Sequence, residues 1–527
     1  MNDTAWKRVA CKEDLKEGIP YPVTVDKAKI FLILLDDTIH ALRDRCPHYG
    51  APLHEGLVSG RHIACPWHHA RFEIATGKLT VPPSLDDLRR FQVKIENGEV
   101  YVGGPEPALS ADGRVTSCVD GKVFAILGAG AAGNAAAEML RREGFSGRIL
   151  LITAEKRLPY DRPNLSKGFL SGEASADWLP LRNEKFYEER NIEILSGRQV
   201  KRLKPADHIL VFSDGEELKF DQALLATGAA PRSIPLPGND LPNVFLLRSM
   251  DDAESILRAV EKSRKAIVLG ASFIGLEVAA ALRERGLEID LVAPEEIPMI
   301  KIFGDRIGRW FQRMHEKHGV RFHLGIMPSR IEKAGDILRI SLSDGSALEG
   351  DLVVGGLGVA PAIGYLEGTD LVHGGAVPVD SCLQTRARGI FAAGDIAAVP
   401  DLRTGEPLRI EHWVVAEAQG QHAARAMLGN TAPYDQIPFF WTRQYGHSIK
   451  YIGHATRFDQ VAFRGGIEEE SFFAGYFHEG KLKAAASLGG GSEFIALGEL
   501  MKAGTPPDFQ SFEDIGTSFV EMTKKLS

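Results

Sequence analysis

One local pattern occurs twice in this 527-residue chain and limits the folds that are open to it. An apolar run typical of a buried strand, Val123–Leu127, leads into the turn Gly128–Gly133 and then into a helix-like segment of small residues. The same order returns where Ala266–Leu269 leads into the turn Gly270–Gly275. Because strands that alternate with helices in this way form parallel sheets, we expect two separate α/β domains.

The first turn has the G-x-G-x-x-G pattern, with its glycines at Gly128, Gly130 and Gly133. Such glycines let the backbone approach a pyrophosphate at the helix N-terminus, where the amides and the helix dipole favour negative charge. Glu155 follows the predicted strand Arg148–Thr153, where an acid binds the ribose hydroxyls of a dinucleotide. The first copy therefore predicts a dinucleotide site.

The second turn departs from this pattern, because Ser272 stands between Gly270 and Gly275 where the middle glycine is usual. Taken singly, it could be only a helix start packed against a sheet. As the second copy it predicts an NAD(P)H site. The expected acid after the next strand is replaced by Ala293, but Glu295 lies just beyond. No Arg or Lys follows before Lys301 to bind a 2′-phosphate, which favours NADH weakly.

Two short motifs near the N-terminus combine cysteine with histidine. Cys46 and His48 form a C-x-H pair, and Cys65 and His68 form a C-x-x-H pair. Two thiolates and two imidazoles on two loops are the ligands of a Rieske [2Fe-2S] centre. A structural zinc site is the alternative, because Zn²⁺ also binds two cysteines and two histidines. The C-x-H spacing and the following Gly50–Leu53 favour the cluster.

Other cysteines and histidines lack ligand spacing. We expect His69 to be a surface side chain beside the cluster. The remaining candidates are interpreted as ordinary small or structural residues: Cys11, Cys118, Cys382, His40, His54 and His62.

Several stretches resemble known families. Cys46–Leu53 with Cys65–Phe72 resembles Rieske ferredoxins, and Leu225–Arg232 with Gly389–Asp395 is similar to the second and third flavin motifs of the two-dinucleotide-binding flavoproteins. Three further stretches are similar to oxygenase-coupled ferredoxin reductases, in which they contact or frame the isoalloxazine: 158–167, 409–413 and 438–442. The whole chain resembles the Rieske-fused, apoptosis-inducing-factor-like ferredoxin reductases, which bind FAD and NAD(P)H.

The resemblance implies roles for individual residues. Lys167 and Glu277 would pair near flavin N5 and gate nicotinamide entry. The alternatives are a solvated loop lysine and an acid on a helix surface. Residues 165–171 contain no cysteine, so thiol chemistry at the flavin is excluded. The other residues that the resemblance assigns to the flavin site are Arg162, Thr227, Gly228, Arg232, Gly394, Asp395, Glu411, His412, Trp413 and Trp441.

These patterns together predict a chain of mixed α/β and β class. An all-β Rieske domain is followed by two Rossmann-like dinucleotide-binding domains and a C-terminal α+β domain. Gly103–Pro107 and the polar residues up to Asp120 have the composition of a linker. The predicted ranges are Rieske domain 1–107, linker 108–120, FAD-binding domain 121–245 with 350–429, NAD(P)H-binding domain 246–349 and C-terminal domain 430–527.

The composition of the chain argues against several classes of binding partner. A net charge of −8 argues against nucleic acid. No apolar run approaches the ~18 residues that a membrane span needs, and the N-terminus has no secretory h-region. Five scattered cysteines suit a reducing cytoplasm. We expect a monomer or homodimer.

The predicted function is electron transfer from NAD(P)H through FAD to the cluster and on to an oxygenase or cytochrome. A quinone or small-electrophile reductase and an NAD(P)H-regulated signalling protein are the alternatives.

Overall fold

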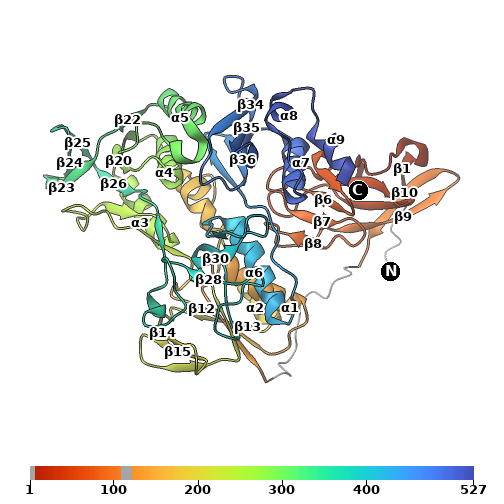
Figure 1. Ribbon diagram of the computed structural model, residues 1–527, viewed down its shortest axis with the longest axis horizontal. Helices are drawn as coiled ribbons and strands as arrows, with labels where there is room; N and C mark the ends of the chain where they lie inside the picture. Colours follow the sequence, from red (N-terminus) through yellow and green to blue (C-terminus); the bar gives the residue numbers. More distant parts are fainter. Residues whose placement is uncertain (1–5, 108–120, 527) are drawn as a thin grey trace.

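The computed structural model describes residues 6–107 and 121–526. The predicted linker 108–120, with Cys118, lies outside the described residues. In Figure 1 the N-terminal strands lie at the right beside the C-terminal helices, and the two parallel sheets lie in the lower and upper left parts of the molecule.

The N-terminal domain is all-β, as predicted. It has a six-stranded sheet in the order β1-β10-β9-β4-β3-β2 and a four-stranded sheet in the order β5-β6-β7-β8. The predicted Asn97-Gly98 turn joins β9 to β10, and both of its residues have positive φ, 51° and 80°. The strands are β1 (Lys7–Cys11), β2 (Tyr21–Val25), β3 (Ala28–Leu35), β4 (Thr38–Arg43), β5 (Leu57–Ser59), β6 (His62–Ala64), β7 (Arg71–Glu73), β8 (Leu79–Val81), β9 (Arg90–Glu96) and β10 (Glu99–Pro105).

One detail of the linker prediction is wrong. Gly103, Gly104 and Pro105 belong to the last strand, β10, rather than to a connecting segment. Gly103 lies beside Trp6, where a Cβ would lie 3.1 Å from the indole ring, so a larger side chain has little room there. Composition alone could not separate this use from a linker.

The first parallel domain is built on a five-stranded sheet in the order β13-β12-β11-β17-β29. Its last strand is contributed by a return of the chain more than 160 residues later. Helix α1 packs against α6 so closely that a Cβ on Gly420 would lie 2.1 Å from the carbonyl oxygen of Ala132. The elements are β11 (Val123–Leu127), α1 (Ala131–Arg142), β12 (Arg148–Thr153), α2 (Glu184–Glu189), β13 (Ile192–Ser196), β17 (Gln222–Leu225), β29 (Ile390–Ala392) and α6 (Trp413–Met427).

The second parallel domain repeats this plan with the order β19-β26-β20-β21-β22. The two predicted strand–turn–helix units are therefore confirmed. Its elements are β19 (Val244–Leu246), α3 (Met250–Val260), β20 (Lys265–Leu269), α4 (Phe273–Glu284), β21 (Glu288–Ala293), α5 (Ile300–Lys317), β22 (Val320–Leu324) and β26 (Leu352–Gly355).

The C-terminal unit is an antiparallel sheet in the order β32-β33-β36-β35-β34, covered by helices, as the α+β prediction requires. Its elements are β32 (Phe439–Gln444), β33 (His447–Gly453), β34 (Gln460–Gly466), β35 (Ser471–His478), β36 (Lys481–Leu488), α7 (Gly491–Lys502), α8 (Phe509–Glu513) and α9 (Phe519–Thr523). Small sheets complete the fold: β14 (Val200–Lys204), β15 (Ile209–Phe212), β16 (Glu217–Lys219), β18 (Ala229–Pro231), β23 (Pro328–Ala334), β24 (Ile337–Leu342), β25 (Ala347–Gly350), β27 (Val359–Pro361), β28 (Val377–Pro378), β30 (Ala397–Pro400) and β31 (Pro407–Leu408).

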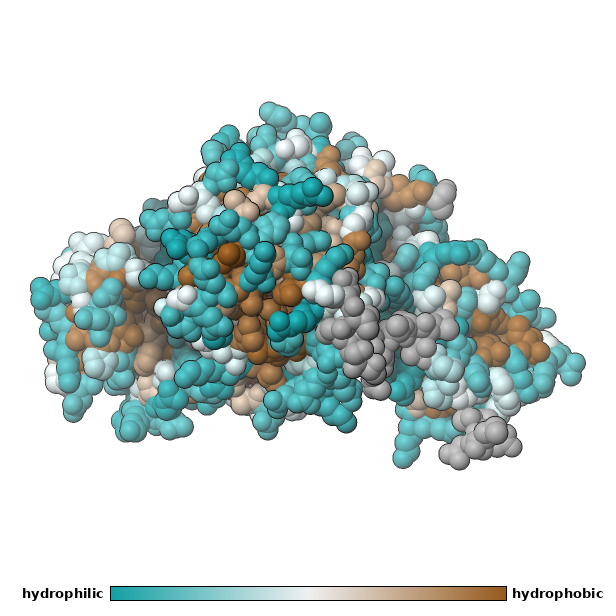
Figure 2. Space-filling view, turned by 90° about the horizontal axis from the view of Figure 1, so that it is seen from below, coloured by the Kyte–Doolittle hydropathy of each residue, from teal (hydrophilic) through white to brown (hydrophobic). Residues whose placement is uncertain are grey.

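The surface view agrees with this division into lobes. The face in Figure 2 is mostly hydrophilic. Its hydrophobic residues gather in patches at the centre and at the right-hand end, and the N-terminal strands form this end of the molecule. Within the residues that the structure describes, no helix is both long enough and apolar enough to cross a bilayer.

A buried ion cluster supports the second parallel domain. Asp290 in β21 is only 2% exposed and binds Lys265 at 2.8 Å, Arg321 at 2.9 Å and His323 at 2.9 Å. Burial opposes its ionisation, but hydrogen bonds from Arg321, Lys265 and His323 hold the pKa of Asp290 well below its usual range.

Asp290→Asn is therefore expected to lower the free energy of unfolding by about 2 kcal/mol at neutral pH, a value discounted because Lys265 and Arg321 stay partly solvated. A depressed carboxyl pKa stabilises the fold above the unfolded value, about 3.9, and this contribution is lost as the pH falls below it. Thermal unfolding curves should show the gap between variant and wild type shrinking below about pH 4. An equal gap at every pH would contradict this assignment.

Candidate functional site

A cleft of about 810 Å³ lies where the two parallel domains meet the C-terminal sheet. Its walls come from the turn before α1, the end of β12, the turn before α4, the segment before α6 and strand β32. This volume is in the upper part of the range for ligand sites in proteins. Of the residues predicted for the flavin and nicotinamide sites, it is lined by Gly128, Gly130, Glu155, Arg162, Lys167, Thr227, Gly228, Ser272, Glu277, Gly394, Asp395, Glu411, His412, Trp413 and Trp441.

The first glycine turn forms a cradle at the floor of the cleft. Gly128 has φ +105°, a conformation that L side chains rarely adopt, and its Cβ would lie 2.1 Å from the carbonyl oxygen of Ala226. A Cβ on Gly133 would lie 1.8 Å from the carbonyl oxygen of Gly128, so α1 packs directly on the turn. At Gly130 a Cβ would meet nothing within 4 Å. The backbone there is open to a phosphate group, which fits a bound dinucleotide.

Glu155 occupies the predicted place after β12 and is held by two neighbours. Its carboxylate accepts hydrogen bonds from the Tyr160 hydroxyl at 2.5 Å and from Arg162 Nη2 at 2.7 Å. Arg162 Nη1 also donates to the carbonyl oxygen of Arg248 at 2.6 Å. The carboxylate thus orients Arg162 along the cleft wall, and it retains lone pairs for further hydrogen bonds.

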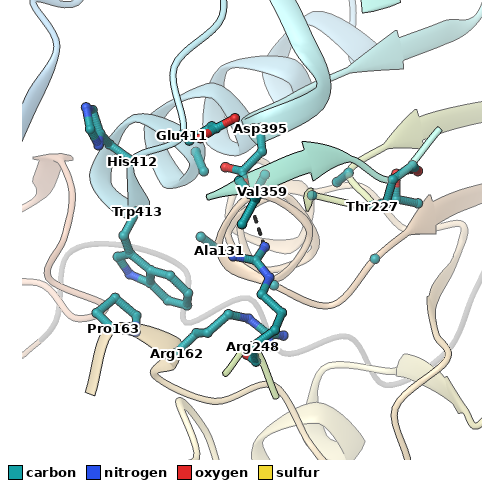
Figure 3. Close-up of a pocket in the computed structure, with 18 of the residues that line it drawn as sticks. Ala131, Arg162, Pro163, Thr227, Arg248, Val359, Asp395, Glu411, His412 and Trp413 are labelled. Atoms are coloured by element: carbon teal, nitrogen blue, oxygen red, sulfur yellow. Dashed lines mark hydrogen bonds and ion pairs between the residues drawn. The ribbon is translucent and has the colours of Figure 1, made fainter. Parts of the chain in front are cut away.

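Arg248 is a cleft residue that the sequence did not reveal. Its Nη2 lies 3.2 Å from Asp395 Oδ2, across the cleft from a different segment, as Figure 3 shows. Burial lowers the pKa of Arg248, although Asp395 opposes the shift. Arg248 lies two residues before α3 and belongs to no recognised motif, so no local signal could have identified it.

Lys167 and Glu277 form an ion pair of 2.8 Å. Lys167 lies in an irregular helical turn, η4 (Leu165–Phe169), with φ −117° and ψ −112°, and its Nζ also donates to the carbonyl oxygen of Pro163 at 3.1 Å. The Glu277 side chain is only 4% exposed. The alternatives of a solvated loop lysine and an acid on a helix surface are therefore wrong.

An aromatic wall closes the opposite side of the cleft. His412 stacks on Phe440 with ring centroids 4.2 Å apart, and its burial lowers the pKa of the imidazole to about 3. Trp413 and Pro163 face one another in Figure 3. These planar, largely apolar groups fit the flat ring system of a flavin.

Five predicted residues lie outside the cleft lining. Arg232 is exposed, and Glu295 is half-buried and lies 3.7 Å from Lys301. Gly270 and Gly275 pack on each other, since a Cβ on Gly275 would lie 1.9 Å from the carbonyl oxygen of Gly270. Ser272 lines the cleft, and its φ of −99° requires no glycine. Gly133 likewise packs against the first turn and does not line the cleft.

The two ligand loops of the N-terminal domain have the same backbone form. Cys46 N–H donates to Ala51 O at 2.9 Å, and Cys65 N–H donates to Ala70 O at 2.8 Å. Both cysteines are buried. Backbone N–H groups of His48 and Tyr49 point at the Cys46 sulfur, and those of Trp67 and His68 point at the Cys65 sulfur. Such donors stabilise thiolates, the form that binds iron.

The two histidines of these loops face one point. His48 Nδ1 and His68 Nδ1 are 3.0 Å apart, close to the separation of about 3 Å expected for two nitrogens bound to one metal at ~2.1 Å. Within the described ranges, no group of three or more ligand-type side chains converges on a single ion position. The two histidines form one ligand pair and the two cysteines form another. This arrangement fits a two-iron cluster and does not fit a single zinc ion held by four ligands.

The expectation that His69 is a surface side chain is wrong. His69 is 8% exposed, and its ring stacks on Phe439 at 4.1 Å. Its φ of +60° lies in the left-handed region, which glycine adopts more readily than histidine. Contact with another domain buries the side chain, and sequence could not show that contact.

The cluster loops dock against the mouth of the cleft. The His68 ring lies 4.1 Å from the ring of Trp441, which lines the cleft. Lys450 Nζ donates to the carbonyl oxygen of Pro66 at 2.7 Å, and Tyr49 donates to Asp161. Arg71 pairs with Glu499 further along the same seam. The predicted metal and flavin sites are thus brought together.

Three family matches cover most of the chain. Residues 122–420 match the pyridine nucleotide-disulphide oxidoreductase family, residues 5–92 the Rieske [2Fe-2S] domain and residues 439–523 the reductase C-terminal domain. The chain is 38% identical to apoptosis-inducing factor 3 of Mus musculus, over 90% of this chain and 80% of the relative. It is 30% identical to the biphenyl dioxygenase system ferredoxin–NAD(+) reductase of Paraburkholderia xenovorans, over 76% and 98%.

Solved structures agree with these matches. The ferredoxin reductase for the CYP199A2 system of Rhodopseudomonas palustris has a TM-score of 0.73 at 32% identity, covering 76% of this chain and all of that one. The covalent putidaredoxin reductase–putidaredoxin complex has a TM-score of 0.73 at 27% identity, covering 77% and 99%.

Proposed function

Since this chain belongs to the pyridine nucleotide-disulphide oxidoreductase family and is an FAD-dependent reductase with a Rieske [2Fe-2S] domain, we propose that it carries electrons from NAD(P)H to its own cluster and then to an external protein. The acceptor would be an oxygenase or a cytochrome. One relative is named as the reductase component of a biphenyl dioxygenase system, and one similar structure is the ferredoxin reductase for the CYP199A2 system, which supports this class of acceptor.

The cleft residues would divide the work of binding FAD. The cradle at Gly128 and Gly130 would receive the pyrophosphate, and Asp395 would contact the ribityl chain, held in place by Arg248. The aromatic wall of His412, Trp413 and Trp441 would pack against the ring system. The turn at Ser272 would receive the nicotinamide nucleotide, with NADH favoured over NADPH. Bound FAD accepts a hydride and releases single electrons, which a [2Fe-2S] cluster takes one at a time.

The contact between His68 and Trp441 carries this proposal. It joins a ligand of the cluster to a residue of the cleft wall with ring centroids 4.1 Å apart, within one folded chain. His48 is only half-buried in the same arrangement and stacks on the 47%-exposed Tyr49 at 3.9 Å. Both histidines thus lie beside Trp441, with ring centroids 4.1 Å away for His68 and 6.1 Å away for His48, and the half-buried His48 leaves this end of the site partly open to solvent.

An anaerobic titration tests the proposal. NADH added to the purified protein should bleach flavin absorbance and then produce the electron paramagnetic resonance signal of a reduced Rieske cluster. The cluster reduction rate should not depend on protein concentration, because the transfer is intramolecular. The same titration with NADPH measures the nucleotide preference. Reduced flavin with a permanently oxidised cluster would refute the proposed route. Slow turnover with every acceptor, together with an NADH-induced change in oligomeric state, would favour a signalling role.

Trp441→Ala is expected to slow cluster reduction by about tenfold, because it removes the packing that sets the distance between cleft and cluster, and displacements of about 1 Å can cost this much. Flavin reduction by NADH should slow less than cluster reduction, even though Trp441 also lines the cleft, and stopped-flow absorbance separates the two phases. Trp178→Ala is the control, since Trp178 is 75% exposed. An unchanged cluster phase in Trp441→Ala would show that this contact is not used.

A further inference from the structure

Behind the ion pair of Lys167 and Glu277 lies a line of buried polar side chains that the cleft does not contain. Thr442 Oγ1 donates to Glu277 Oε1 at 2.7 Å, and Gln444 Nε2 donates to Thr442 Oγ1 at 3.1 Å. His315 Nε2 lies 2.7 Å from Gln444 Oε1. We call Thr442, Gln444 and His315 the buried series. Their exposed fractions are 1%, 3% and 0%.

The direction of every hydrogen bond in the buried series follows from its end at Glu277. A carboxylate only accepts, so Thr442 must donate its single hydroxyl proton to it. Thr442 then accepts from the NH₂ of Gln444, which turns the amide oxygen toward His315. His315 must therefore carry its proton on Nε2 and leave Nδ1 bare. His315 Nδ1 has no partner among the described residues, as this tautomer allows.

The surroundings of His315 keep it neutral. Burial lowers the pKa of His315 to about 4, and His318 adds to the shift while Gln444 opposes it. The rings of Phe322 and Tyr445 pack edge-on against the imidazole with centroids 6.0 Å and 5.1 Å away. A neutral imidazole in an apolar shell is a fixed hydrogen-bond donor at physiological pH.

The buried series connects separate parts of the reductase. Glu277 lies in α4 and His315 in α5 of the second parallel domain, whereas Thr442 and Gln444 lie in β32. On the other side of the carboxylate, Ser166 and Lys167 of the first domain donate to Glu277 Oε2 at 2.5 Å and 2.8 Å. Glu277, a residue of the second parallel domain, is therefore hydrogen-bonded to side chains of both other units.

The two faces of strand β32 contact different parts of the protein. Successive side chains of a strand point to opposite faces. Phe439 and Trp441 contact His69 and His68 of the Rieske domain, whereas Thr442 and Gln444 are buried on the side of Glu277. The same strand thus contacts the cluster domain on one face and holds Glu277 on the other.

We propose that Thr442, Gln444 and His315 are positioning residues that hold the Glu277 carboxylate in register with Lys167 and the cleft, and so set the geometry for hydride delivery from NAD(P)H. This inference rests on the proposed function. None of the three side chains lines the cleft, so they act through Glu277. Without the buried series, the Glu277 carboxylate would still be present, but its position would no longer be held. Such a change slows the chemical step more than it weakens nucleotide binding.

Thr442→Val tests the proposal, because it removes the hydroxyl and nearly preserves the shape. The limiting rate of flavin reduction by NADH should fall about tenfold, with the dissociation constant of NADH changed by less than about twofold. Thr442→Ser keeps the hydroxyl and should recover most of the rate. Gln444→Met, which breaks the series one step further out, should lower the rate in the same direction. FAD content and melting temperature show that each variant is folded.

Ser487→Ala is the matched control. Ser487 is 0% exposed in β36 of the same sheet and donates to the carbonyl oxygen of Gly489, away from Glu277. It should leave the reduction rate unchanged. A wild-type rate in Thr442→Val, an equal loss in Thr442→Ser, or a loss in Ser487→Ala would each overturn the proposal.

A second readout does not depend on turnover. Nitrogen-15 spectra of histidine-labelled protein should contain one imidazole, missing in His315→Gln, that is protonated on Nε2 alone near neutral pH. A proton on Nδ1 would overturn the hydrogen-bond directions. If the wild type holds FAD but NAD(P)H does not reduce it, the proposed function fails, while this measurement still decides whether the buried series is built as described.

Discussion

Cys65→Ala is expected to abolish electron delivery to one-electron protein acceptors and to leave flavin reduction by NADH unchanged. Cys65 is 1% exposed, and backbone N–H groups of Trp67 and His68 point at its sulfur, so an alanine removes a buried thiolate from a position built around it. A cluster that has lost one of its four protein ligands is not retained. Cytochrome c reduction should fall to the rate of the flavin domains alone, with loss of iron, acid-labile sulfide and the cluster's paramagnetic signal.

Cys382→Ala provides the control for cysteine loss. Cys382 is a free, half-buried thiol whose sulfur lies near the carbonyl oxygens of Thr431 and Ala432, far along the chain from the cluster loops. It should keep full iron content and full activity. If Cys65→Ala still reduced cytochrome c at the wild-type rate, electrons would leave the protein directly from the flavin.

Lys167→Ala is expected to slow flavin reduction by NADH about 100-fold, because the residue's cation is placed at the cleft by an ion pair that fixes both partners. It should also cost about 2–3 kcal/mol of stability, since the Glu277 carboxylate, 4% exposed, would lose its charged partner and keep only the hydroxyl donors Ser166 and Thr442. Stopped-flow reduction and thermal unfolding measure the two effects separately.

A double substitution separates charge burial from catalysis. Lys167→Ala combined with Glu277→Gln removes both charges, so stability should return toward that of the wild type. The slow reduction should remain. Lys156→Ala is the control, because Lys156 is an exposed lysine of the same domain. Wild-type reduction kinetics in Lys167→Ala would show that the ion pair is structural only.

The sequence by itself determined the features that depend on local chemistry. A turn that needs positive φ at Gly128 and a close approach at Gly133 accepts almost only glycine, so the first dinucleotide turn was visible. The same holds for Cys46, His48, Cys65 and His68, because metal ligands must be these residue types at short spacing. The strand–turn–helix order followed from apolar runs, and both units were found where predicted.

Only the tertiary structure decided which distant residues meet. Arg248 and Asp395 are 147 residues apart in the chain, and Thr442 and Glu277 are 165 apart. His69 is buried because Phe439 of another domain packs on it, and Gly103 belongs to a strand because β10 pairs with β1 and β9. Such contacts depend on the summed packing of whole domains, and no single residue carries a local mark of its future neighbour. The chemistry of each loop could therefore be predicted from the sequence, whereas its position against the cleft could not.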